Sequence, residues 1–427
     1  MRVWKSEALP ADWFKRQTEN VKATREFQDK VQNVITRVRE RGDDGLLGCI
    51  NDFDKCSLTK KTLKVRKEEI KEAYTKATLE QVCALKFMKE KVNTFQKQLL
   101  TQTELKTSSD GVWVQTVLRP IESVGCYVPG GQAAYPSTLI MTAVPAKVAG
   151  VPRIVVCSPP DAKGKVNPLV LVAADICGVD EVYKVGGAQA IAALAYGTKT
   201  IKPVRKIVGP GSKYVTAAKV LVSTDVAIDM PAGPSEVLVL ADESADVRFI
   251  AFDMVSQAEH GGDSVAGLIT TSEKVALQVQ ENIATVAASA ERFEKVSEAL
   301  SKYGFIIVCK SMEEAVSLVN QFAPEHLEVM TAKPKEIAEK LTAGLILLGP
   351  YSPVALSDYG SGTNHVLPTG GFAQSFSGLS TLDFMRRASI VESSRTGLER
   401  VKDYVKAMAE AENLPNHYKA IEARFEK

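Results

Sequence analysis

The sequence has little histidine, no paired cysteines and no excess of charge of either sign. Its 427 residues include 53 lysines and arginines against 51 aspartates and glutamates, for a formal net charge of +2. This balance provides no basic surface of the kind that binds nucleic acid or an anionic membrane. We therefore expect neither nucleic acid nor a membrane among the partners.

The seven cysteines are an odd number, and no two of them form a C-x-x-C pair. This pattern fits neither a disulfide framework nor a zinc site built from thiolates. The first residues, MRVWKSEALPADWF, lack the apolar core of a secretory signal. We expect reduced cysteines and a cytoplasmic location.

Long apolar runs are also missing. The longest hydrophobic region, around residues 138–157, is interrupted by Lys147, Arg153 and several prolines, so it does not predict a membrane span. With 45% hydrophobic and 24% charged residues, the composition is that of an ordinary soluble globular protein. The length predicts about two to three domains.

The chain changes texture along its length. Apolar residues recur at helical spacing over 22–41, which predicts a helix ending at Gly42, and helix-forming sequence continues to about residue 103. From 113 to 240, β-branched runs alternate with alanine-rich stretches and Gly/Pro turns, which predicts parallel βαβ units. Another α/β segment covers 304–348. The sequence after SGLSTLDFMRR predicts one long amphipathic helix and a short tail.

Glycine-rich turns recur in the α/β region. YKVGGAQAIAALAYG and RKIVGPGSKYVTAAKV each predict a strand, a glycine turn and a helix, whose first N–H groups can bind phosphate. Neither contains G-x-G-x-x-G, so a tight turn with close packing remains an equal alternative. In VGCYVPGGQAAYPS, Tyr127 and Tyr135 flank two glycines and could stack on a flat ligand.

The four histidines all lie in polar, turn-flanked segments. In SQAEHGGDS, Gln257 and His260 are three residues apart at the end of a helix predicted over 247–260, so their side chains would share one face. An amide carbonyl and an imidazole there can chelate a divalent cation such as zinc. The alternative is a polar helix end, where a histidine complements the dipole.

The segment FAPEHLEVM is the most suggestive of acid–base chemistry. Pro324 predicts the first turn of a helix, which puts Glu325 and His326 at its N-terminus. The positive end of the dipole would keep His326 neutral and ready to accept a proton. Neighbouring helical residues point in different directions, so the pair could serve two successive proton transfers. Alternatively, Glu325 merely complements the dipole.

Two other segments carry the remaining histidines. ALSDYGSGTNHVLP places Asp358 and His365 in a Gly/Ser-rich loop, although an aspartate before a glycine turn is also a common turn former. His417 lies in LPNHYKA near the C-terminus, and Glu412 precedes it by five residues. Composition alone favours a solvated tail histidine and an ordinary charged helix residue for these two.

Taken together, these segments resemble the histidinol dehydrogenase family. The resemblance runs from ITRVRERGDD and NDFDK to the tail. Its most specific segments are VGCYVPGGQAAYPSTLIMTAVPAKVAGV, VYKVGGAQAIAALAYGT, MPAGPSEVLVLADE, QAEHGGDS, FAPEHLEV, DYGSGTNHVLPTGG and SGLSTLDFMRR.

The resemblance implies an α/β fold with two incomplete Rossmann-like domains, distinct from the fold of aldehyde dehydrogenases. The implied division has four parts. They are an N-terminal arm (1–24), a first α/β domain with the metal and catalytic motifs (25–120 plus 236–375), a second α/β domain (121–235) and a helical C-terminal dimerisation segment (376–427).

The family oxidises L-histidinol to L-histidine in two consecutive NAD-dependent steps through a bound aldehyde, at the end of histidine biosynthesis. The resemblance implies one zinc ion per subunit, which would hold the substrate by its imidazole and amino nitrogens. Its implied ligands are Gln257, His260, Asp358 and His417. The family is a homodimer with crossed C-terminal segments, so His417 and Glu412 would complete the neighbouring subunit's site.

The resemblance also implies roles for individual side chains. His326 would take the alcohol proton in the first oxidation, and Glu325 would then activate water to hydrate the aldehyde, with His326 assisting the second oxidation. The implied substrate contacts are Ser235, Gln257, His260, His326, Asp358, His365, Glu412 and His417, and the implied cofactor contacts are Tyr127, Gln189 and Ser212.

The chain departs from the family at a few positions. Ser212 stands where members usually have an asparagine in G-P-G-N, and a hydroxyl cannot reproduce the paired contacts of an amide. This leaves NAD affinity and cofactor choice open. Gly262 and Val265 replace the usual proline and glutamine near the metal motif, from which we expect altered loop rigidity rather than loss of zinc.

Three alternative functions remain open from the sequence. The first is a sister dehydrogenase acting on another small polar alcohol, such as a sulfonated propanediol, although Glu412 and His417 favour an imidazole-bearing substrate. The second is a zinc hydrolase that shares the metal site and uses no nucleotide. The third is a non-catalytic homologue, which the intact pair Glu325–His326 argues against.

Overall fold

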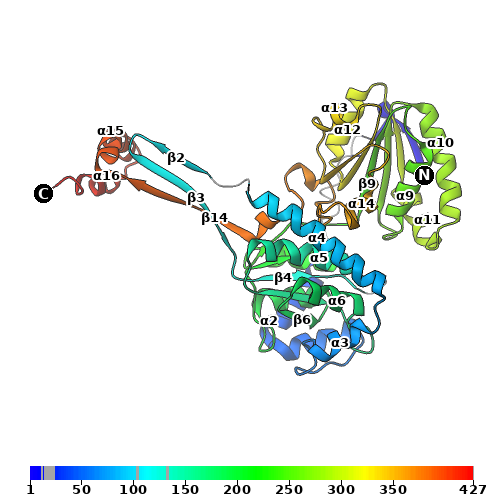
Figure 1. The fold of residues 1–427 in the computed structure, drawn as a ribbon, viewed down its shortest axis with the longest axis horizontal. Coiled ribbons are helices and arrows are strands. Elements are labelled where there is room, and N and C mark those ends of the chain that lie inside the picture. The colour runs from blue at the N-terminus through cyan, green and yellow to red at the C-terminus, as the bar shows by residue number, and fades with distance from the viewer. Residues whose placement is uncertain (11–12, 14–24, 102–104, 131–133, 427) are drawn as a thin grey trace.

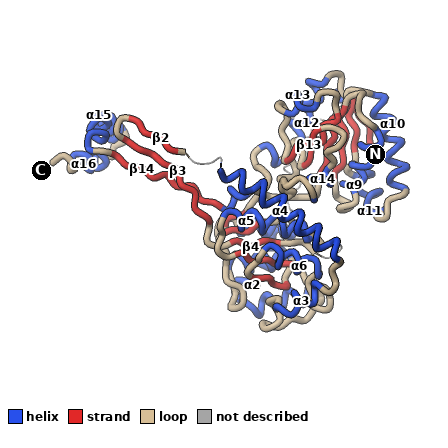
Figure 2. The backbone as a smooth tube through the Cα atoms, in the orientation of Figure 1, coloured by secondary structure: helices blue, strands red, loops and turns tan. Residues whose placement is uncertain are grey.

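Two parallel sheets, each covered by helices, form two lobes, and an arm projects from one of them (Figures 1 and 2). The computed structural model describes residues 1–10, 13, 25–101, 105–130 and 134–426. Within these ranges, no helix is long and apolar enough to cross a membrane. The predicted α/β class is confirmed.

The first lobe is built on a five-stranded sheet of order β6-β5-β4-β7-β8, in which all strands are parallel. Helices connect successive strands, which confirms the βαβ units predicted over 113–240. The strands are β4 (Val124–Tyr127), β5 (Ile154–Ser158), β6 (Glu181–Lys184), β7 (Lys206–Val208) and β8 (Ala227–Ile228). The connecting helices are α5 (Pro136–Ala149), α6 (Pro168–Cys177), α7 (Gly187–Tyr196) and α8 (Lys213–Val222).

Helices cover both faces of this sheet, because the central strands are apolar on both sides. Ile154 and Val156 of β5 face a cluster that includes α5 and α6, whereas Val155 and Cys157 face α7 and α8. Three more helices complete these layers: α2 (Arg25–Phe53) packs beside α7, α3 (Lys67–Tyr74) beside α6, and α4 (Leu79–Thr101) beside α5.

The packing of α2, α3 and α4 corrects the expected domain division. The resemblance implies one domain of residues 25–120 and 236–375, but Val31, Ile35 and Val38 of α2 are buried in the core of the five-stranded lobe. Helical periodicity shows which face of a helix is buried and not which sheet buries it. Gly42, the predicted helix end, breaks the helix with φ 54°, and a second helical stretch continues to Phe53.

The second lobe is built on a six-stranded parallel sheet of order β1-β11-β10-β9-β12-β13. Its strands are β1 (Arg2–Lys5), β9 (Glu236–Ala241), β10 (Val265–Thr270), β11 (Phe305–Val308), β12 (His326–Met330) and β13 (Leu345–Leu348). Its helices are α9 (Val247–Ala258), α10 (Glu273–Ala288), α11 (Phe293–Lys302), α12 (Met312–Phe322), α13 (Pro334–Ala338) and α14 (Val354–Tyr359).

The expected N-terminal arm is partly a strand of this sheet. β1 pairs with β11, and the 3-10 turn η1 (Ser6–Ala8) follows it. Apart from residue 13, the rest of the 1–24 segment beyond residue 10 lies outside the described residues. Without β1, the two sheets have the same strand order. The first three strands are added in one direction from β4 or β9, and the next strand, β7 or β12, is added on the opposite side of that first strand.

The arm consists of an antiparallel sheet and two helices at its tip (Figure 1). The strands are β2 (Lys106–Ser109), β3 (Val112–Pro120) and β14 (Met385–Ser393), and the helices are α15 (Arg395–Ala411) and α16 (Pro415–Glu422). Two 3-10 turns, η2 (Phe372–Gln374) and η3 (Thr381–Phe384), come before β14 in the chain. The prediction of one long helix after SGLSTLDFMRR is therefore wrong. Residues 385–393 pair with β3, and Asn413 with φ 55°, followed by Pro415, separates the two helices.

Candidate active site

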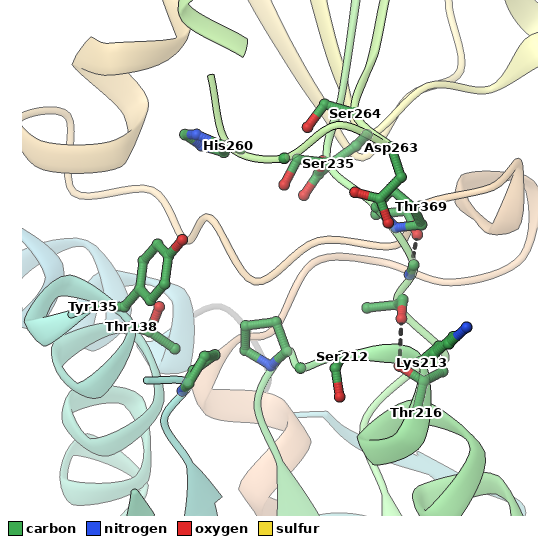
Figure 3. Close-up of a pocket in the computed structure, with 18 of the residues that line it drawn as sticks. Tyr135, Thr138, Ser212, Lys213, Thr216, Ser235, His260, Asp263, Ser264 and Thr369 are labelled. Carbon is green, nitrogen blue, oxygen red and sulfur yellow. Dashed lines mark hydrogen bonds between the residues drawn. The ribbon is translucent and has the colours of Figure 1, made fainter. Parts of the chain in front are cut away.

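A cavity of about 830 Å³ lies between the two lobes. The five-stranded sheet contributes residues that follow its strands, such as Gly130 after β4 and Ser212 after β7. The six-stranded sheet contributes residues just before the start of its strands, such as Ser235 and Ser264 (Figure 3). Glu325, just before β12, lines the cavity as well. The cavity thus lies at the carboxyl edge of one sheet, beside its strand-order reversal, where open parallel sheets usually bind ligands.

A glycine after β7 allows the chain to pass close to the neighbouring strand β4. Gly209 has φ 114°, and a Cβ on it would collide with the carbonyl oxygen of Tyr127 in β4. Its N–H donates to Oδ2 of Asp229 at 2.7 Å. These contacts hold the backbone of Gly209 in place, and the turn that follows it brings Ser212 to the cavity.

His326 and Glu325 line the cavity together, but not at a helix N-terminus as predicted. His326 is the first residue of β12, between β9 and β13, and the whole strand HLEVM is buried. The preceding helix, α12, ends at Ala323 with φ 45°. A proline disfavours helical geometry in the residue before it, so Pro324 follows the end of one helix instead of opening another.

The pKa of His326 is also shifted against the prediction. Burial lowers it, but the carboxylates of Glu325 and Asp358 and a hydrogen bond with the backbone of Glu236 outweigh burial, and the net shift is upward. Nδ1 lies 3.6 Å from Oε2 of Glu325 and 3.1 Å from the carbonyl oxygen of Glu236. A proton on this ring is therefore stabilised once it arrives.

Asp358 and His365 form a second polar pair in the cavity wall. Nδ1 of His365 lies 3.4 Å from Oδ1 of Asp358, and both residues line the cavity. Burial raises the pKa of Asp358, but His365, His326 and His260 lower it further than burial raises it. Three of the four histidines, from three distant segments of the chain, therefore act on one carboxylate.

Gln257 and His260 do not share a helix face. α9 ends at Ala258, so His260 lies in the turn beyond it, exposed and lining the cavity. Gln257 is 2% exposed, and its Nε2 has no hydrogen-bond partner in the part of the chain that is described. The helix is shorter than the predicted 247–260, which removes the geometric basis for a chelating pair on one helix face.

The three implied cofactor residues differ in position. Ser212 lines the cavity at the start of α8, and its side chain does not cap that helix. Tyr127 and Gln189 are buried outside the cavity lining. The Tyr127 hydroxyl accepts from the N–H of Gly187 at 3.1 Å, and the Gln189 amide donates to Oδ2 of Asp54 at 3.2 Å. Tyr135, the other tyrosine of the first glycine turn, does line the cavity.

Comparisons with known proteins give the family. The family pattern of histidinol dehydrogenase matches residues 16–425. The chain belongs to the histidinol dehydrogenase family. It is 45% identical to a histidinol dehydrogenase of Methanothermobacter thermautotrophicus over 92% of each chain, and 46% identical to one of Clostridium acetobutylicum over 95% of this chain and 94% of the relative.

A solved histidinol dehydrogenase has the same fold. The crystal structure from Elizabethkingia anophelis superimposes with a TM-score of 0.93 and 36% identity, and the match covers 100% of this chain and 98% of that one. The chain is therefore an oxidoreductase of a family that oxidises histidinol in histidine biosynthesis.

Two site residues implied by the histidinol dehydrogenase family lie outside the cavity lining, on the arm. Glu412 follows the end of α15, and His417 lies in α16 at the arm's tip, far from both lobes (Figure 1). Both side chains are exposed. Within one chain, the arm does not bring them to the other site residues.

The donor set in the cavity fits a zinc ion only in part. Asp358 and His260 offer the carboxylate and imidazole donors that zinc prefers, and the unpartnered amide of Gln257 lies three residues before His260. No group of three or more His, Cys, Asp or Glu side chains that could hold a metal occurs among the described residues. The residues of one chain therefore fit a metal site that still lacks a ligand.

Sequence reasoning missed several residues that shape the site. Glu236 contacts the backbone or side chain of both Glu325 and His326, and Thr369 accepts a hydrogen bond from the N–H of Gly233. Asp54 contacts Gln189, and burial raises its pKa to about 6. A carboxylate that opens the buried strand EVLVLA was the one signal available in the sequence for Glu236.

Proposed function

We propose that this chain catalyses the NAD-dependent and zinc-dependent oxidation of L-histidinol to L-histidine, with L-histidinaldehyde as the intermediate. One observation carries the proposal: Nε2 of His326, in the cavity wall, is buried and has no hydrogen-bond partner among the described residues. A carbonyl oxygen beside Nδ1 can only accept, so Nδ1 carries the hydrogen and Nε2 is the basic nitrogen.

In the first oxidation, Nε2 of His326 takes the proton of the substrate hydroxyl. NAD, when bound, would supply the acceptor for the hydride that the alcohol carbon loses. The imidazolium that results is stabilised by the carboxylate of Glu325, 3.6 Å from Nδ1. The raised pKa of His326 has this cause and favours holding the proton through the step. General-base assistance of this kind contributes roughly 10²–10⁴-fold to a rate.

In the second oxidation, Glu325 takes a proton from water as the water adds to the aldehyde. His326, which has released its first proton to solvent between the two steps, then accepts a proton from the resulting hydrate, and a second hydride leaves the same carbon. Loss of two hydrides and addition of one water convert the alcohol to the carboxylate, so two equivalents of NADH are expected for each histidinol. Retaining the aldehyde between the steps allows the same two side chains to serve both.

Zinc would be held by Gln257, His260 and Asp358 of one subunit and by His417 of a second copy. When bound, it supplies a Lewis acid that holds the substrate through its imidazole and amino nitrogens. Ser235 and His365, which line the cavity, and Glu412 of the second copy would contact the substrate.

We also propose that the protein is a homodimer whose arms exchange between subunits. The arm exposes large apolar side chains that a second copy would cover, among them Ile390, Val391, Tyr404 and Met408, which are 42%, 62%, 76% and 58% exposed. This arrangement would return His417 to a cavity.

The seven cysteines, all described, carry no disulfide, which agrees with a cytoplasmic location.

NAD would bind along the five-stranded lobe. The side chain of Ser212 leaves the first N–H groups of α8 uncapped, so they are available to a phosphate. Tyr127 and Gln189 support the neighbouring start of α7. A serine at position 212 offers one hydroxyl where an asparagine would offer an amide, which we expect to weaken NAD binding.

The test is the yield of NADH per L-histidinol consumed by zinc-loaded protein at mildly alkaline pH. Two equivalents, with histidine as the product, support the proposal. Oxidation of a sulfonated propanediol with no reaction on histidinol would assign the sister activity instead, and amide or ester hydrolysis without NADH formation would assign a hydrolase. If neither NADH nor hydrolysis is seen, Ser212→Asn is the variant that tests whether cofactor binding has failed.

A further inference from the structure

Glu236 is a buried carboxylate that opens β9 between Ser235 and Val237, and its residue exposure is 1%. Its two carboxylate oxygens have separate backbone donors. Oε1 accepts from the N–H of Gly370 at 2.9 Å, and Oε2 accepts from the N–H of Glu325 at 3.3 Å. The side chain thus joins the start of β12 to the turn at residues 369–371.

The contact between Glu236 and Glu325 is reciprocal. The N–H of Glu236 donates to Oε2 of Glu325 at 2.8 Å, while the N–H of Glu325 donates to the carboxylate of Glu236. The carbonyl oxygen of Glu236 lies 3.1 Å from Nδ1 of His326. A single residue therefore contacts both side chains to which the proposed function assigns proton transfers.

These contacts determine which nitrogen of His326 faces the substrate. Because a carbonyl oxygen holds the hydrogen on Nδ1, the lone pair is on Nε2, the nitrogen without a partner among the described residues. The carbonyl keeps this role only while the starts of β9 and β12 stay in register. The carboxylate of Glu236 bonds across that junction, so its charge and length matter to the ring of His326.

We propose that Glu236 is a positioning residue, whose carboxylate holds Glu325 and His326 in the orientation needed for proton transfer. It does not touch the substrate, since Glu236 is not among the residues that line the cavity. The inference depends on the proposed function for the identity of the reaction, but the orientation of the His326 ring can be measured without any reaction.

Glu236→Gln tests the proposal with little change in volume. The amide has only one acceptor oxygen, so either the N–H of Gly370 or that of Glu325 must face an NH₂ group. We expect kcat for NADH formation to fall roughly 10- to 100-fold, the cost of a small misplacement of reacting groups, with KM for histidinol and zinc content unchanged. We also expect the pH dependence of kcat to shift.

The matched control is Glu181→Gln. Glu181 likewise opens a strand, β6, and accepts two hydrogen bonds, from Arg153 at 2.7 Å and from Tyr183 at 2.5 Å, but it is outside the cavity lining. This variant should lower the melting temperature and leave kcat unchanged. If Glu236→Gln behaves in the same way, Glu236 is merely structural and the proposal is wrong.

A measurement independent of activity uses the four histidines. With ¹⁵N-labelled histidine, four imidazole groups give NMR signals, and His326→Ala identifies the signal of His326. We expect Nδ1–H in the wild-type protein and mixed tautomers in Glu236→Gln. Unchanged ring signals in the variant would overturn the proposal. If the ring signals change as expected but wild-type protein does not oxidise histidinol, the positioning role stands and the proposed function fails.

Discussion

Nδ1 of His365, in the loop that follows α14, lies 3.4 Å from Oδ1 of Asp358, which is in α14 itself. Both side chains are 13% exposed, so solvent screens the contact only weakly. Burial alone would raise the pKa of Asp358, yet the histidines around it keep the pKa below its usual value. His365 thus maintains the carboxylate in the ionised form that a cation requires.

Replacing His365 with alanine should weaken zinc retention. The variant leaves Asp358 with one orienting partner fewer, and the loss of such a partner typically lowers metal affinity 10- to 100-fold. Zinc content after dialysis against a graded chelator measures this directly. Ser361→Ala, in the same loop and exposed, is the control that should retain zinc as the wild type does. Equal retention in both variants would contradict the assigned role.

Replacing His326 with alanine should remove the proton acceptor of the first oxidation. We expect the rate of NADH formation from histidinol to fall roughly 10²–10⁴-fold. Steady-state kinetics of alcohol oxidation measure the loss. A rate close to the wild-type rate would show that another group takes the proton.

A shared site predicts complementation between two inactive variants. In a dimer that combines one His326→Ala chain with one His417→Ala chain, one of the two sites receives intact residues from both chains. Random pairing after co-expression should restore about one quarter of the wild-type sites. Each variant alone should remain inactive. If the mixture is also inactive, the site is not built across two subunits.

Stability should depend on an ion pair beneath the turn that carries Ser212. Lys219 pairs with Asp229, their side chains are 3% and 1% exposed, and Lys219 also donates to the carbonyl oxygen of Gly209 at 2.9 Å. Lys219→Met leaves a buried carboxylate uncompensated and should cost about 3–5 kcal/mol in the free energy of unfolding. Denaturant titration measures it.

The control for that prediction is the exposed pair of Lys147 and Asp180, 3.5 Å apart. Lys147→Met should cost less than about 1 kcal/mol, as exposed pairs usually do. The double variant Lys219→Met/Asp229→Asn should recover part of the stability, because it removes the uncompensated charge.

A buried acid pair should make stability fall as pH rises. Burial raises the pKa of Asp253 to about 6 and also raises the pKa of Glu328, which lies beside it. Between about pH 4, where these groups titrate in the unfolded chain, and pH 6 or above, the folded state holds a proton that the unfolded state has released. The contribution of these two groups to the free energy of unfolding is therefore lost as pH rises through that interval.

Glu328→Gln removes one of the two negative charges and keeps an oxygen that can accept from the N–H of Val354. We expect the variant to exceed the wild type in stability by about 1–2 kcal/mol at pH 8, allowing for the solvent that reaches Asp253. The difference should shrink below pH 5. Melting temperatures measured across this range check both the sign and the interval, and a constant difference would contradict the coupling of the two acids.

The alternation of strands and helices was predictable because each βαβ unit is a local pattern. The Gly209 turn and the helix stop at Gly42 followed from glycine in the same way. The position of His326 did not, since a proline after αL Ala323 and a proline that opens a helix look alike in sequence. What distinguishes them is β9, which lies almost ninety residues earlier and pairs with β12.

The site was predictable residue by residue and not as a geometry. Ser212, Ser235, His260, Glu325, His326, Asp358 and His365 do converge on one cavity. Glu236 was missed because its partners, Glu325 and Gly370, are 89 and 134 residues away in the sequence. Periodicity also gave no indication that α2, α3 and α4 belong to the five-stranded lobe, because the apolar face of a helix does not show which sheet it packs against.

The use of opposite edges of two similar sheets gives the cavity an electrical polarity. α5 and α8 begin at its wall in one lobe, and α9 and α12 end near it in the other. Helix starts carry partial positive charge and helix ends partial negative charge, worth about 0.3–1 kcal/mol each to a suitable ion. This polarity would attract the phosphates of a dinucleotide to one wall, and a metal ion or a protonated amine to the other. Two ligands of opposite charge can enter together and face each other in a single orientation.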